Sequence, residues 1–134
     1  MGDRHVTAMP PDAALEGRLR DLGATVSSWS NGPGDRYAPH EHGYAKILVA
    51  VQGAITFELP SAGEVVELRA GDRFDLPAGT SHAARVGDQG VRCLEAHLPA
   101  THLGSLPRHV TGWAFGTAAE SARLVAKTAD GTGT

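Results

Sequence analysis

The sequence predicts an all-β domain, folded as a barrel or sandwich, with one short helix before it. The first observation is a series of short apolar or alternating runs between residues 24 and 99. The second is the punctuation between these runs, because clusters such as "NGPGD", "PSAG" and "PAGTSH" favour turns. The third is that the clearest helical periodicity is confined to a segment before residue 24. Regularly spaced short strands are typical of sandwiches and barrels.

The helical segment is "PPDAALEGRLRDLGA", residues 10–24. Pro11 and Asp12 suit a first helical turn, and Gly23 suits the C-terminal cap. The apolar positions of this segment recur at helical spacing, at Leu15, Leu19 and Leu22. The segment therefore predicts a short helix with one apolar face.

The strands are expected where apolar or alternating runs occur, at residues 24–30, 36–42, 43–51, 54–59, 64–68, 73–76, 83–86 and 91–98. Turns are expected at Gln52-Gly53 and at residues 86–90. After Pro99 the pattern weakens, with a further strand expected at 110–115 and a helix at 118–127. The chain is thus divided into an N-terminal segment with a short helix (1–23), a β-barrel domain (24–116) and a C-terminal tail (117–134).

The composition is that of one ordinary globular domain, because 134 residues with 41% hydrophobic content suffice for a real core. The formal net charge is -3, and the basic residues form neither a stripe nor a cluster, so neither nucleic acid nor a membrane surface is an expected partner. The one cysteine, Cys93, cannot form an internal disulfide. No signal-peptide pattern is visible at the N-terminus. A cytoplasmic protein is therefore expected.

The stretch "PHEHGYAK", residues 39–46, contains two histidines one residue apart. On a strand, His40 and His42 would project from the same face. His82 follows the turn predicted at residues 77–79 and is expected to point into the same barrel mouth. Three neutral imidazoles suit Zn, Fe, Ni or Cu better than Ca or Mg. Three protein ligands also leave coordination positions open for another molecule.

Two stretches resemble the conserved motifs of the cupin superfamily. The stretch "GDRYAPHEHGYAKILVAVQG" (34–53) is similar to the first motif, and "GDRFDLPAGTSH" (71–82) is similar to the second. The resemblance covers about residues 34 to 98 and identifies the chain as a small single-domain bacterial cupin of the cupin 2 type. It implies a single jelly-roll β-barrel, often a homodimer, in which His40, His42 and His82 bind a divalent transition metal such as Fe, Zn, Ni or Mn.

The sequence departs from the cupin motifs at two positions. Val86 replaces the Asn of the second motif, which is not a metal ligand, and Lys46 replaces the Glu of the first motif. Four arrangements of Lys46 remain open. It swings aside from a three-histidine metal site, it lies in the pocket as a neutral amine that acts as a base, it pairs with an acid, for which Glu95 is the best candidate, or it marks a pocket without metal. We favour the first, with the second as a variant.

Strand alternation places further residues near the histidines. Tyr44, Lys46 and Leu48 share their face if Gly43 carries no bulge, whereas residues 45, 47, 49 and 51 form an apolar opposite face. A partner subunit or the helix at 12–22 would cover that face, and this is the reason from the residues to expect a dimer. The substrate pocket is expected to include Tyr44, Phe57, Glu95 and His97, with His97 near the rim, and Lys46 is the candidate catalytic residue.

Two functional classes follow from these observations. The first is a metal-binding cupin with a small-molecule pocket, as in metal-dependent dioxygenases or isomerases of small oxygen-rich substrates. The alternative is a non-catalytic module that binds a sugar or metabolite, with or without a metal. Fold alone does not decide between them, because one fold hosts many functions.

Overall fold

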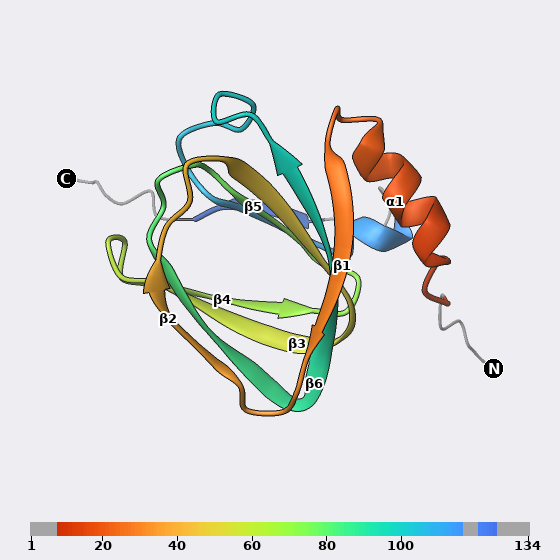
Figure 1. The fold of residues 1–134 in the computed structure, drawn as a ribbon. Helices are drawn as coiled ribbons and strands as arrows, with labels where there is room; N and C mark the ends of the chain where they lie inside the picture. Colours follow the sequence, from red (N-terminus) through yellow and green to blue (C-terminus); the bar gives the residue numbers. More distant parts are fainter. Residues whose placement is uncertain (1–7, 117–120, 126–134) are drawn as a thin grey trace.

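The computed structural model describes residues 8–116 and 121–125, and these form one helix packed beside a β-barrel (Figure 1). The helix is α1 (Asp12–Arg20), as the leucine spacing predicted. The strands are β1 (Thr25–Asn31), β2 (Arg36–His40), β3 (Ala45–Leu59), β4 (Glu64–Arg69), β5 (Arg73–Leu76), β6 (His82–Leu98), β7 (Arg108–Thr111) and β8 (Ser121–Leu124). A short 3-10 helix, η1 (Trp113–Phe115), follows β7. None of the described helices has the length and apolar composition needed to cross a bilayer.

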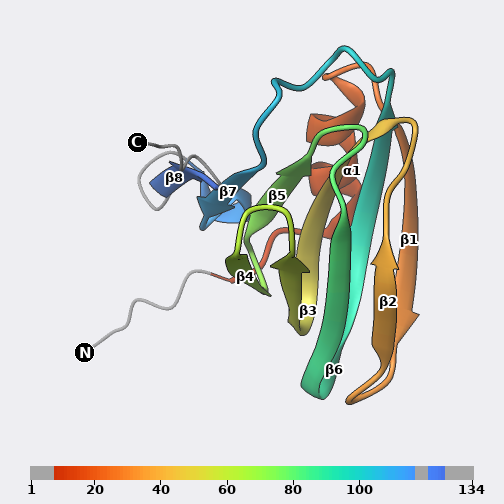
Figure 2. The same cartoon turned by 90° about the vertical axis from the view of Figure 1, so that its left-hand side faces the viewer.

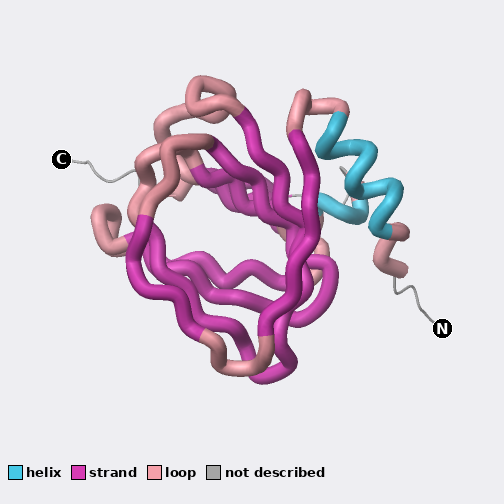
Figure 3. The backbone as a smooth tube through the Cα atoms, in the orientation of Figure 1, coloured by secondary structure: helices cyan, strands magenta, loops and turns pink. Residues whose placement is uncertain are grey.

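All strand pairs in the barrel are antiparallel, and the sheet order is β1-β6-β3-β5-β7-β8. The strand β2 pairs with β6, and β4 pairs with β3, so β3 and β6 each contact strands on both sides of the barrel. The tube in Figure 3 shows these strands surrounding a central space, and Figure 2 shows the barrel from the side. The predicted all-β jelly-roll class is confirmed.

Two glycine-marked segments that predicted turns lie instead inside long continuous strands. Residues 52–53 belong to β3, and residues 86–90 belong to β6. Gly53 and Gly90 have φ angles of 72° and 76°, and the β3–β6 register shifts on both sides of Gly53. A Cβ atom on Gly53 would lie 1.9 Å from the Gly90 carbonyl oxygen, so only glycine permits this close approach. The glycines therefore bend two strands around the barrel without ending them.

Alternate residues of β3 enter two different apolar cores, as the strand pattern predicted. One core lies inside the barrel and includes Leu48, Phe57 and Phe74. The other core includes Ile47 and Val49, and α1 covers it with Leu15 and Leu19. Leu22, the third predicted member of the helix stripe, is 43% exposed. The helix α1 and η1 thus cover the outer face within one chain. The apolar face of β3 therefore no longer gives a reason to expect a partner subunit there.

The C-terminal region corrects two expectations. Residues 121–124, placed in a helix by the sequence pattern, form β8 and pair with β7. Of the rest of the expected helix, Val125 is buried and belongs to no helix, and residues 118–120 and 126–127 lie outside the described residues. The expected strand at 110–115 is divided between the end of β7 and η1. Asp72 anchors this region, because its carboxylate accepts hydrogen bonds from the Gly112 amide (3.0 Å) and from His109 Nε2 (3.1 Å).

Candidate metal centre and ligand cavity

The three predicted histidines lie together at one end of the barrel. One potential ligand atom from each of His40, His42 and His82 lies within 4.8 Å of the others. His40 ends β2 and His82 begins β6, where the two residues pair across the strands. The sequence pattern placed His42 on a strand, but it lies in the loop after β2. There its carbonyl accepts a hydrogen bond from the Gly79 amide (2.8 Å). That bond joins the two motif loops and brings the rings together.

Backbone carbonyls orient two of the imidazole rings. His82 Nδ1 lies 2.9 Å from the Thr80 carbonyl oxygen, and His40 Nδ1 lies 2.8 Å from the Ala38 carbonyl oxygen. Because a carbonyl oxygen only accepts hydrogen bonds, each Nδ1 carries the proton and each Nε2 presents a lone pair. A hydrogen bond from Nδ1 to a carbonyl oxygen commonly fixes the tautomer of a metal-binding histidine.

His82 is the most revealing member of the cluster. Its side chain is 2% exposed, and among the described residues its Nε2 is the one buried side-chain nitrogen or oxygen without a hydrogen-bond partner. The pKa of this imidazole is lowered from 6.5 to about 4, chiefly by burial and less by the neighbouring His40, Lys46 and His42, against the opposing effect of the Thr80 bond. Burial and Lys46 also lower the pKa of His42. These two rings are therefore held neutral, the form that binds metals.

The donor set therefore fits a divalent transition metal. Three imidazoles supply nitrogen ligands, and the orphaned Nε2 of His82 gains a partner when a metal binds. The departure from the cupin pattern is nearby, because Lys46 Nζ lies 3.4 Å from His42 Nε2. An ammonium group repels a cation, so this residue opposes metal binding unless its charge is balanced.

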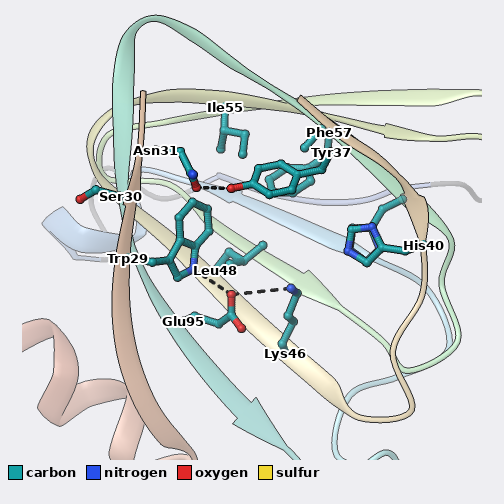
Figure 4. A pocket seen from close by; sticks show the side chains of 12 residues that line it. Trp29, Ser30, Asn31, Tyr37, His40, Lys46, Leu48, Ile55, Phe57 and Glu95 are labelled. Atoms are coloured by element: carbon teal, nitrogen blue, oxygen red, sulfur yellow. Dashed lines mark hydrogen bonds and ion pairs between the residues drawn. The ribbon is translucent and has the colours of Figure 1, made fainter. Parts of the chain in front are cut away.

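Glu95 supplies the balancing charge. Lys46 is 9% exposed and points into the barrel, with Nζ 3.6 Å from Glu95 Oε1 (Figure 4). The structure therefore contains the Lys46–Glu95 pair that was one of the open arrangements. The favoured arrangement, a three-histidine metal site with Lys46 swung aside from the metal, stays a prediction. The strand alternation explains the pair, because Lys46 and Glu95 stand on the inner faces of adjacent strands, β3 and β6.

Two further donors hold the Glu95 carboxylate. Trp29 Nε1 donates to Oε1 at 2.8 Å, and His97 Nε2 lies 2.5 Å from Oε2. Burial alone would raise the pKa of Glu95, but the His97 bond, the Lys46 charge and the Trp29 bond outweigh it and lower the pKa. Glu95 is therefore an anion fixed by side chains from β1, β3 and its own strand.

These residues border a cavity of about 380 Å³ inside the barrel. Its polar side includes His40, His82, Lys46 and Glu95, and Figure 4 shows Lys46 between Glu95 and His40. Its apolar walls come from several strands: Trp29, Leu48, Ile55, Phe57 and Ala84. A concave apolar space with a few convergent polar groups is the usual form of a small-molecule site.

The remaining expected pocket residues divide between cavity and rim. Phe57 and Glu95 line the cavity, but Tyr44 and His97 do not. Tyr44 packs between the rings of His42 (4.9 Å between centroids) and His97 (4.3 Å), and the His97 side chain is 43% exposed. Cys93 is fully buried, and burial raises the pKa of its thiol to about 12, which excludes a thiolate nucleophile.

The strand pattern did not assign three polar residues of the cavity wall. Ser30 and Asn31 end β1, and the Tyr37 hydroxyl donates a hydrogen bond to Asn31 Oδ1 across the gap between β1 and β2 (Figure 4). Tyr37 and His40 differ in strand parity, yet both line the cavity, because the β2–β6 register shifts between them. Alternation fails across such a bulge.

The match to known families decides the broad classification. Residues 29–112 match the AraC-like ligand binding domain. The chain belongs to this family, which is a cupin-type domain. The match begins at Trp29 and covers both histidine segments, so the family region contains the entire cavity. No curated protein matches the sequence.

Solved structures agree with this family in their fold. A protein of unknown function from Rhizobium leguminosarum is 17% identical, with a TM-score of 0.52 over 57% of this chain and 70% of that one. The cupin domain of Cnp3 from Schizosaccharomyces pombe is 15% identical, with a TM-score of 0.52 over 58% of this chain and 57% of that one. A variant of oxalate decarboxylase from Bacillus subtilis is 16% identical, with a TM-score of 0.50 over 60% of this chain and 23% of that one. These identities establish the fold alone.

Proposed function

We propose that this AraC-like ligand binding domain binds a divalent transition metal through His40, His42 and His82, beside a cavity for a small oxygen-rich molecule. The observation that carries the proposal is the buried, unpartnered Nε2 of His82, which shares a site with two other imidazoles. A buried polar atom without a partner is costly, and metal binding removes that cost. Three protein ligands leave coordination positions for the molecule in the cavity.

The residues around the histidines have separate tasks in this proposal. Thr80 and Ala38 orient the rings of His82 and His40 through their carbonyl groups. The apolar walls exclude water from the body of the bound molecule. When bound, the metal supplies Lewis acidity to an oxygen of that molecule. Because no carboxylate ligand reduces the charge of the metal, the site favours an anionic or chelating molecule.

Lys46 is the residue placed to move a proton if the cavity performs a reaction. Its Nζ faces both the histidine cluster and Glu95. The reaction class that fits is oxygenation or isomerisation of a small oxygen-rich substrate, in which a base or a hydrogen-bond donor acts beside the coordinated oxygen. Dioxygenase or isomerase activity is thus the catalytic form of the proposal.

The second candidate is a ligand-binding module without catalysis. Two observations favour it: the description of the matching family is ligand binding, and an ammonium group 3.4 Å from His42 Nε2 opposes a metal. In this form the histidines line a metal-free pocket. The cavity and its walls are the same in both candidates, so the experiment must separate metal, binding and turnover.

The test has two stages. Metal-free protein is titrated with Zn²⁺, Ni²⁺, Mn²⁺ and anaerobic Fe²⁺ in a calorimeter, and His82→Ala and the exposed-residue control His102→Ala are titrated in parallel. Saturable binding at one ion per chain that only His82→Ala loses supports the metal site. Oxygen uptake by the iron-loaded protein with a panel of diketones, thiols and enols then supports the enzyme. No metal binding by the wild type overturns the first candidate and leaves the metal-free module.

A further inference from the structure

Lys46 has few contacts for a buried ammonium group. It is 9% exposed, and its two polar contacts among the described residues are 3.4 Å to His42 Nε2 and 3.6 Å to Glu95 Oε1. Charge-assisted hydrogen bonds from an ammonium nitrogen to a carboxylate oxygen are usually about 2.7–2.9 Å long. An ammonium group has three donors. The side chain is therefore attracted to Glu95 but retains hydrogen-bonding capacity toward the cavity that it lines.

Glu95 does not hold this lysine closely, because Nζ lies 3.6 Å from Oε1, and other groups donate shorter hydrogen bonds to both carboxylate oxygens. Oε1 accepts a hydrogen bond from Trp29 at 2.8 Å, and Oε2 lies 2.5 Å from His97 Nε2. The carboxylate is thus fixed in place by the indole and the imidazole. It balances the Lys46 charge from a distance and positions Nζ between itself and the histidine cluster, as Figure 4 shows.

The charge balance of the cavity points in the same direction. Lys46 and Glu95 form a pair with no net charge, and histidines bind a metal through neutral rings. A divalent metal at the histidines therefore adds two uncompensated positive charges next to Lys46. An anionic oxygen is the group that interacts favourably with both.

We propose that Lys46 is the specificity-determining residue of the cavity and that the ligand is a small α-oxygenated carboxylate with an apolar body. One carboxylate oxygen accepts a hydrogen bond from Lys46 Nζ, and the adjacent α-oxygen faces the histidines. The apolar body lies against Trp29, Leu48 and Phe57. Because Nζ and His42 Nε2 are 3.4 Å apart, a ligand that reaches both needs two oxygens on neighbouring carbon atoms. The inference rests on the proposed function for the α-oxygen, whereas the role of Lys46 stands without a metal.

The test compares charged probes with neutral ones of the same shape. Metal-free protein is titrated with mandelate and benzoate and with their amides, mandelamide and benzamide, and binding is followed by calorimetry and by tryptophan fluorescence, to which Trp29 in the cavity wall contributes. The wild type is expected to prefer each carboxylate over its amide by about tenfold or more, the worth of a hydrogen bond to a charged group. Lys46→Met is expected to lose this preference, and Lys46→Arg to keep part of it.

Two controls make the outcome specific. Arg85→Met removes one exposed positive charge from β6 outside this cavity, so it is expected to keep the wild-type preference. Thermal unfolding checks that each variant is folded. An unchanged preference in folded Lys46→Met overturns the proposal, and so does a wild type that binds neither carboxylate at millimolar concentration.

The metal-loaded protein separates this inference from the proposed function. Metal is expected to strengthen mandelate binding more than benzoate binding, because only mandelate has the α-oxygen. If the protein binds no metal but the carboxylate preference still depends on Lys46, the metal site fails and the role of Lys46 survives. If metal binds and the preference is absent in the wild type, the inference fails and the metal site survives.

Discussion

The inner and outer faces of β3 differ sharply, although their residues alternate along the same strand. The outer face is apolar and closed, because α1 and η1 cover Ile47 and Val49. The inner face carries Lys46 and Leu48 and borders a cavity that His40 and His82 also line, with His42 beside these two rings. A largely buried carboxylate lies near each face, and the two carboxylates have different partners.

Asp72 and Glu95 make this difference clear. Asp72 accepts hydrogen bonds from two backbone amides, those of Arg69 and Gly112, and from His109, so it fixes the chain that covers the outer face. Glu95 contacts side chains alone, and one of these is the cavity lysine. Asp72 therefore fixes the backbone of the layer that covers the outer face, whereas Glu95 holds side chains beside the cavity. We expect substitutions on the outer face to change chiefly stability, and substitutions at the cavity to change metal and ligand binding.

The largest effect on stability is expected from the outer face. Leu19 is fully buried between α1 and the barrel, and Leu19→Ala is expected to lower the free energy of unfolding by about 2–5 kcal/mol because it leaves a cavity. Urea unfolding measures this change. Metal and probe affinities of the folded variant are expected to equal those of the wild type. A loss of either would show that the two faces are coupled.

Asp72→Asn tests the structural role of Asp72 through the pH dependence of stability. Burial raises the pKa of Asp72, but the bonds from His109, Gly112 and Arg69 outweigh it, so the pKa lies below 3.8. A carboxyl group with a lowered pKa in the folded state stabilises the protein above its unfolded pKa and loses that contribution as pH falls through the folded value. Asp72→Asn is expected to cost about 1–3 kcal/mol at neutral pH.

Urea unfolding at a series of pH values checks this prediction. As pH falls below about 4, the wild type is expected to lose more free energy of unfolding than Asp72→Asn, since only the wild type has this carboxylate to protonate. Equal acid sensitivity of the two proteins would contradict the role given to Asp72. Ligand probes are expected to bind both proteins alike at neutral pH.

The sequence predicted the inner face better than its surroundings. Motif spacing located His40, His42 and His82, and strand alternation placed Lys46 with Leu48 on the inside. Alternation could not locate Tyr37, because a register shift in β2 reverses its parity. The pairing partners of a strand are also set by long-range topology, so the Trp29–Glu95 bond between β1 and β6 has no local signal.

The long strands show a second limit of the sequence pattern. Glycines at 53 and 90 look like turn residues, yet they form bends where β3 and β6 approach each other. Glycine signals an unusual backbone angle but does not say whether the chain reverses or continues. The strand β8 shows the limit of periodicity in another way, because four residues that pair with β7 lie within the helical pattern of residues 118–127.

A substitution at the histidine cluster is expected to change the stability of the metal-free protein less than Leu19→Ala or Asp72→Asn, and to raise it instead of lowering it. His82 Nε2 is buried without a partner, which costs stability until a metal binds. The free energy of unfolding of metal-free His82→Leu is therefore expected to equal that of the metal-free wild type or to exceed it by up to about 2 kcal/mol. Added metal is expected to raise the melting temperature of the wild type alone. Strong destabilisation of metal-free His82→Leu would instead give His82 a structural role.

Glu95→Gln tests the inner face through its charge. The amide keeps the shape of the side chain but leaves the Lys46 charge unbalanced, so the free energy of unfolding is expected to fall by about 1–3 kcal/mol. The cavity loses a negative charge, and benzoate is therefore expected to bind several-fold tighter than to the wild type. Calorimetry measures the affinity, and benzamide serves as the neutral probe. Weaker benzoate binding would mean that Glu95 is needed chiefly to position Lys46.

The metal content of the purified protein shows whether the three histidines form a metal site. Wild-type protein, His82→Ala and His102→Ala are purified without an affinity tag or chelator, and the metals per chain are counted by mass spectrometry. The account predicts a nearly stoichiometric transition metal in the wild type and in His102→Ala, and its loss in His82→Ala. A wild type that holds no metal, even after loading with iron, zinc, nickel and manganese, would contradict the account.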